Sequence, residues 1–83
     1  MNEMMFEKYI NMLTPGHIKQ FADSENVEIT EREVNLVYST IKTRYKDLLA
    51  GDFTILETIK DELSEPVYKK TIELIEKYRY LLD

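Results

Sequence analysis

Apolar residues recur at spacings of three and four along almost the whole chain, which is the periodicity of an amphipathic helix. Only two glycines and two prolines occur, and they stand near the points where helices are expected to begin or end. The sequence therefore predicts an all-α protein. We expect a compact array of four to five short helices, forming a single domain over residues 1–83.

The first helix is predicted over Glu3–Leu13. Its apolar residues fall on one half of a helical wheel and are expected to face the core: Met5, Phe6, Tyr9, Ile10, Met12 and Leu13. The opening is also rich in methionine, at positions 1, 4, 5 and 12. We expect these flexible side chains to fill gaps in the core, and an adaptable partner surface is the alternative.

Two further helices carry clear start signals. Thr14 is a suitable N-cap for a short helix that begins with Pro15 and ends near Asn26, a residue that tolerates left-handed backbone. Thr30 and Glu33 have the spacing of a capping box, which starts the third helix. That helix is expected to run to about Ala50, with Gly51 as its C-cap, and with a core stripe of Val34, Tyr38, Ile41, Tyr45 and Leu48.

The last two helices are less sharply marked. Either Asp52 or Thr54 starts the fourth helix, the latter in a second capping box with Glu57. The run Ser64-Glu65-Pro66 allows the chain to restart as a fifth helix that continues to the C-terminus. Its apolar face is broad, and we expect this helix to lie centrally: Val67, Tyr68, Thr71, Ile72, Leu74, Ile75, Tyr78, Leu81 and Leu82.

Composition narrows the class of protein. The chain has no cysteine, which removes disulfides, thiolate zinc sites and thiol nucleophiles, and its formal net charge of -5 disfavours phosphate backbones and anionic lipids. No apolar run approaches the roughly 18 residues of a membrane span, and the opening lacks the basic region of a signal peptide. We expect an acidic, cytoplasmic protein of bacterial type.

Residues for catalysis are sparse. His17 is the one histidine, in the first turn of the short second helix, and its expected role is that of a surface or half-buried side chain near a cap. The many carboxylates fall in first turns or among lysines, as on ordinary solvated helices. No phosphate-binding glycine loop or nucleophile motif occurs. We therefore expect no enzyme activity, no catalytic residues, no metal site, no cofactor and no small-molecule substrate.

Two kinds of partner remain. Leu36 and Tyr80 lie off the apolar stripes of their helices, so with Met4 and Met5 they are candidate contacts for a protein partner or a second copy of the chain. The leading hypothesis is thus a small interaction module or homodimer. The alternative is a nucleic-acid-binding unit over residues 14–49, in which Lys42 and Lys46 share one helix face.

The layout also resembles a known family. Three features carry the resemblance: the first helix ending in Leu13-Thr14, the segment Ile18–Ala22 followed by Val27-Glu28-Ile29-Thr30-Glu31, and the Phe53 segment leading to Glu65-Pro66 and a final amphipathic helix. In these respects the chain resembles the YqfT-like family of short, uncharacterised helical proteins from Gram-positive bacteria. The resemblance implies a helical fold, and it brings no activity and no functional residues.

Overall fold

The computed structural model of the 83-residue chain describes residues 3–82. Within that range the chain forms helices α1 (Glu3–Met12), α2 (Pro15–Ser24), α3 (Glu31–Leu49), α4 (Thr54–Ile59) and α5 (Glu65–Leu82), with a short 3-10 helix at Lys60–Glu62. The described part contains no strand, so the all-α prediction is confirmed. The predictions made for Met1 and for the side chains of Phe6, Tyr78, Leu81 and Leu82 lie outside the described residues.

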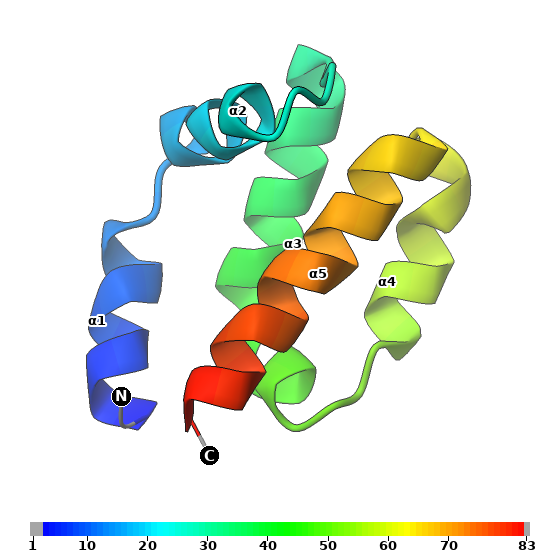
Figure 1. Ribbon diagram of the computed structural model, residues 1–83. Helices are drawn as coiled ribbons and strands as arrows, with labels where there is room; N and C mark the ends of the chain where they lie inside the picture. Colours follow the sequence, from blue (N-terminus) through cyan, green and yellow to red (C-terminus); the bar gives the residue numbers. More distant parts are fainter. Residues whose placement is uncertain (1–2, 83) are drawn as a thin grey trace.

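The centre of the array is α3, against which α1, α2, α4 and α5 all pack. Figure 1 shows α1 and α2 on one side of α3, α4 on the other, and α5 lying across it. The expectation that the last helix lies centrally is therefore wrong. The reason is that α3 buries residues along nearly its whole length, from Glu33 to Leu48, whereas α5 packs chiefly on α3.

The two threonine caps are confirmed at atomic detail. The Thr14 hydroxyl accepts a hydrogen bond from the His17 backbone N–H at 3.3 Å, and His17 Nδ1 accepts one from the Thr14 N–H at 3.2 Å. At the start of α3 the Thr30 hydroxyl accepts from the Glu33 N–H at 3.1 Å, and Glu33 Oε1 accepts from the Thr30 N–H at 3.0 Å. His17 thus takes the place that glutamate usually holds in a capping box.

Helices α2 and α3 are each followed by the residue that was predicted to adopt left-handed backbone geometry. Asn26 has φ of 57° after α2, and Gly51 has φ of +91° after α3. A Cβ at Gly51 would lie 2.9 Å from Arg79 Nη2, so both backbone angle and space favour glycine there. Local chemistry decides where these two helices stop.

The sequence offered two capping residues for the start of α4, Asp52 and Thr54, and the structure agrees with only one of them. The helix begins at Thr54 without a side-chain cap, so the proposed capping box of Thr54 and Glu57 is wrong. The Asp52 carboxylate instead accepts a hydrogen bond from the Thr54 N–H at 3.1 Å. Hydrogen bonds from the side chain and then the backbone of Thr54 lower the pKa of Asp52. Asp52 therefore supplies the acceptor for the first turn, in agreement with the other alternative.

The core is one apolar cluster that α3 shares with every other helix, and it contains Ile10, Ile18, Val34, Val37, Ile41, Leu48, Leu56, Ile59, Leu63, Val67 and Ile75. Leu36 is half-buried and packs against this cluster, so it is not an exposed apolar residue. The buried residues of α3 include Glu33, Val37 and Thr40, which lie outside the predicted stripe. The buried face of the helix is therefore closer to Leu36 than the predicted stripe is. Leu36 consequently lies at the edge of the core.

Candidate functional site

Helix α1 buries one narrow face and exposes another apolar face. Among its described side chains Ile10 is the buried one, while Met12 is 69% exposed, Met4 70% and Tyr9 55%. Met5 is also exposed. The prediction that Met5, Tyr9 and Met12 face the core is therefore wrong, and so is gap-filling by the described methionines. Helix α3 is the main helix packed against α1, and several described residues of the wide apolar arc of α1 are exposed.

Three of the exposed residues share one face of α1. Met5, Tyr9 and Met12 follow one another at intervals of four and three, which places them in a line along the helix. We call these three residues the methionine stripe. Sequence reasoning had named Met4 and Met5 as candidate contacts and had offered Met12 only within the alternative of a methionine partner surface, but it missed Tyr9. The available signal was the width of the apolar half of α1, which is broader than one neighbouring helix covers.

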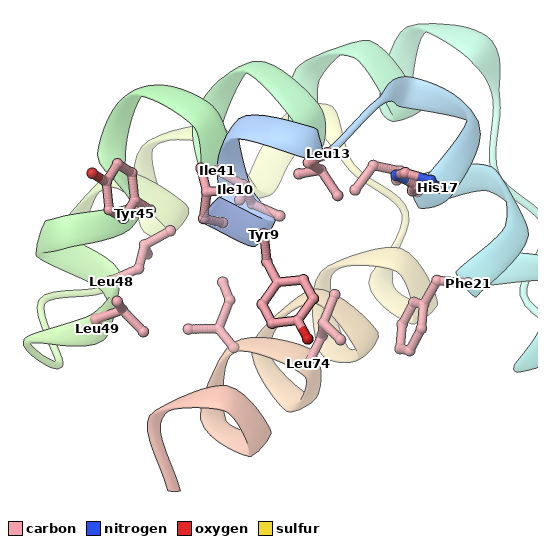
Figure 2. A pocket seen from close by; sticks show the side chains of 12 residues that line it. Tyr9, Ile10, Leu13, His17, Phe21, Ile41, Tyr45, Leu48, Leu49 and Leu74 are labelled. Atoms are coloured by element: carbon pink, nitrogen blue, oxygen red, sulfur yellow. The ribbon is translucent and has the colours of Figure 1, made fainter. Parts of the chain in front are cut away.

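The methionine stripe borders an apolar cavity of about 170 Å³ that is partly open to solvent. Four helices supply its described lining: Tyr9, Ile10, Leu13, His17, Ile18, Phe21, Ile41, Tyr45, Leu48, Leu49, Leu74 and Ile75. Figure 2 shows the Tyr9 ring extending from α1 toward Leu74 on α5. Tyr9 thus belongs both to the exposed stripe and to the wall of the cavity.

A bend in α3 shapes one wall of the cavity. Arg44 leaves helical geometry, with φ of -123° and ψ of 19°. One residue earlier the Thr43 hydroxyl donates a hydrogen bond to the Ser39 carbonyl oxygen at 2.7 Å, and such bonding back to the preceding turn bends helices. The lining residues Tyr45 and Leu49 follow the bend, so its angle sets their position in the wall.

The described lining of the cavity carries few polar atoms and no carboxylate, ammonium or guanidinium group. The two tyrosine hydroxyls, of Tyr9 and Tyr45, and the His17 ring are its polar groups. Since His17 Nδ1 accepts a hydrogen bond from Thr14, the neutral ring carries its proton on Nε2. The cap fixes this imidazole in a structural role, as the sequence predicted for a histidine near a cap.

Lys42 holds the end of α1 against α3. Its ammonium donates hydrogen bonds to the carbonyl oxygens of Ile10 at 3.1 Å and Asn11 at 3.3 Å, and it lies 5.9 Å from the centre of the Tyr38 ring. A cation at a helix C-terminus is favourable because unpaired carbonyls collect there. Lys42 is thus engaged within the fold, whereas Lys46, the second candidate for nucleic-acid contact, is exposed.

The other candidate contacts do not meet at the cavity. Tyr80 is 81% exposed and lines a separate shallow depression with Ile72, Lys77 and Arg79 on α5. Met4 and Met5 lie on α1, and Leu36 lies half-buried on α3. The structure therefore gathers the exposed apolar residues on α1 and leaves Tyr80 apart from them.

Glu33 joins the starts of α3 and α5. Its side chain is buried, and its second carboxylate oxygen, Oε2, accepts a hydrogen bond from the Ser64 N–H at 2.8 Å. Burial raises the pKa of Glu33, but the hydrogen bonds from Ser64 and Thr30 outweigh it and hold the pKa below the ordinary value. The position and partners of Glu33 are those of a structural link rather than a catalytic acid.

Comparison with protein-family models, curated proteins and solved structures gives no significant match for this chain. The resemblance to the YqfT-like family stays a prediction. Over residues 3–82, no helix combines the length and apolarity that crossing a membrane requires. The same described residues contain no group of three carboxylate or imidazole side chains placed to hold a metal ion.

Proposed function

We propose that the protein is a helical interaction module that self-associates as a homodimer through α1. The observation that carries the proposal is the methionine stripe, in which three exposed apolar side chains form a line along the surface of α1. Contiguous exposed apolar groups of this kind mark interaction sites more often than isolated ones do. Methionine suits such a surface because its flexible thioether adapts to a partner.

A second copy is the partner that the shape of this surface favours. A two-fold interface places the same patch on both subunits, so it must be self-complementary. Here the methionine stripe adjoins the partly open apolar cavity, because Tyr9 belongs to both. In an antiparallel pairing of two α1 helices about Tyr9, Met5 of each copy comes opposite Met12 of the other, and each methionine stripe covers the cavity of the other copy.

The area that a dimer needs is within reach. A standard interface buries about 800 Å² on each partner, which is about one seventh of the 5736 Å² accessible surface of this chain. The net charge of -5 on each copy opposes association, so salt should strengthen the dimer by screening this repulsion. A phosphate-binding protein shows the opposite dependence, because salt weakens its binding.

The experiment is sedimentation equilibrium from about 1 μM to about 1 mM, the range over which weak dimers dissociate. We expect a monomer–dimer equilibrium that tightens with salt. Met12→Glu should weaken the dissociation constant about tenfold or more, which is about 1.4 kcal/mol. Asn11→Glu is the matched control, since it adds the same charge in the same turn on the polar face and should leave association unchanged. A monomer at all concentrations, or equal effects of both variants, would reject the proposal.

The nucleic-acid alternative has weaker support. Its two residues were Lys42 and Lys46, and the Lys42 ammonium already donates to the carbonyl oxygens at the end of α1. Only Lys46 of this pair is exposed to meet a phosphate. No geometric observation favours this function over self-association.

A further inference from the structure

We propose that the apolar cavity binds a small, neutral, apolar molecule of about the size of one aromatic ring. This inference goes beyond self-association and does not depend on it, because the lining comes from a single chain. The exposed methionine stripe would contact a second copy, whereas the ligand would lie behind Tyr9, between α1 and α5 (Figure 2).

The size of the cavity sets the size of the ligand. An apolar cavity of about 150 Å³ in a protein core stays dry and takes up benzene. The cavity here measures about 170 Å³ and reaches the buried side chains of Ile18, Leu48 and Ile75. One aromatic ring, or a short branched alkyl group, matches that volume, whereas a drug-sized molecule does not fit within it.

The lining sets the chemistry of the ligand. Among the described lining residues no carboxylate, ammonium or guanidinium group is present, so a charged molecule would lose its hydration without gaining a partner. The rings of Tyr9, Phe21 and Tyr45 border the volume and offer edge-to-face contacts to a second aromatic ring. An uncharged aromatic molecule is the class that these walls favour.

Access does not require the core to open. Tyr9 lies on the wall of the cavity, yet 55% of its surface is exposed. Exposed side chains change rotamer within picoseconds to nanoseconds, so the Tyr9 ring can move aside while α3 and α5 stay packed. Movement of the Tyr9 side chain alone would thus open a path for the ligand.

One larger side chain in the wall would fill the cavity. Leu74, on the α5 side, is the position where an added ring would enter the volume.

Benzene titration of the full chain, followed by methyl NMR at a concentration where the protein is monomeric, tests this inference. We expect saturable shifts and benzene contacts at the methyl groups of Ile18 and Leu74, while those of Leu56 and Ile59 stay fixed. Leu74→Phe fills the cavity and should weaken benzene binding about tenfold or more. Ile72→Phe makes a comparable change on the same helix, outside the cavity, and should leave binding within about twofold.

The contacts between benzene and the wild-type methyl groups need no variant, so the result stands even if Leu74→Phe fails to fold. Absence of saturable shifts up to the solubility limit of benzene would overturn the inference. So would shifts spread evenly over the core, or binding that Leu74→Phe and Ile72→Phe weaken alike.

Discussion

Helices α1 and α4 flank α3 on opposite sides and use their apolar residues in opposite ways. The six residues of α4 include Leu56, which is 0% exposed, and the buried Ile59. The ten residues of α1 include Ile10 as their buried apolar side chain among those described, and they expose Met4, Met5, Tyr9 and Met12. Among the described side chains, the shorter helix thus contributes more to the core.

This difference shows where the chain has apolar surface to spare. The loss of backbone conformational entropy opposes folding by about 1–2 kcal/mol per residue. Small domains therefore need nearly every apolar side chain in the core. Helix α1 nevertheless leaves large parts of Met4, Met5, Tyr9 and Met12 exposed. The α4 side of α3 therefore serves stability, and the α1 side is where we propose that a partner and a ligand bind.

The largest expected effect lies on the α4 side. Leu56→Ala removes a fully buried side chain and leaves a cavity, so it should lower the free energy of unfolding by about 3 kcal/mol. Urea unfolding monitored by circular dichroism measures this value. Glu57→Ala, an exposed neighbour on the same helix, is the control and should change stability by about 0.5 kcal/mol or less. Equal losses would mean that α4 does not anchor the core.

A second, smaller effect is expected at Glu33, which links the starts of α3 and α5. Glu33→Ala leaves the N–H groups of Thr30 and Ser64 without their acceptor and should cost about 2 kcal/mol. Unfolding by urea at neutral pH measures the loss. A loss below about 0.5 kcal/mol, the range of ordinary surface changes, would show that water replaces the carboxylate.

Glu33 also predicts the direction of the pH dependence. Because the pKa of Glu33 is lowered in the folded state, its contribution is complete above the ordinary value of 4.5 and is lost as pH falls through the folded pKa. Glu33→Gln removes this titration, so the decline in stability below about pH 4.5 should be shallower in the variant. Parallel pH profiles of the variant and the wild type would contradict this assignment.

Lys42 tests how α1 is held to the rest of the fold. Lys42→Met removes the ammonium that bonds to the carbonyl oxygens of Ile10 and Asn11, and α1 should loosen by about 1 kcal/mol. Hydrogen exchange of the α1 amides should then become faster, while exchange in α4 stays unchanged. Lys46→Met, at the next exposed lysine on α3, is the control, and faster exchange in both variants would reject a specific role for Lys42.

Local signals in the sequence were sufficient for the helix boundaries. Thr30 and Glu33 specify the start of α3 because both partners of the capping box lie within one turn. Gly51 specifies its end because few other residues adopt positive φ without strain. The start of α4 stayed open because Asp52 and Thr54 both offer a capping oxygen, and only the three-dimensional backbone selects Asp52.

The exposed surface of α1 and the cavity were harder to predict from the sequence. Tyr9 and Met12 fall on the apolar half of a helical wheel, and a wheel shows which residues share a face but not whether a neighbouring helix covers it. The contact of Lys42 with α1 and that of Glu33 with Ser64 join residues about 30 positions apart, as their separations of 32 and 31 show. The α3 wall of the cavity includes residues that follow the bend at Arg44, and neither the bend nor the neighbouring Thr43–Ser39 hydrogen bond is revealed by periodicity.

The smallest expected effect is the one that most directly tests the contrast between α1 and α4. Met12→Ala shortens a side chain that is 69% exposed, so in dilute protein it should change the free energy of unfolding by about 0.5 kcal/mol or less. In concentrated protein the dimer stabilises the fold by mass action, and the variant should then unfold at a lower temperature than the wild type. Thermal unfolding at two protein concentrations separates the stability of the single chain from the stabilisation by the dimer. A loss of more than about 1.5 kcal/mol in dilute protein would mean that Met12 stabilises its own chain, as Leu56 does, and would remove the distinction between the two helices.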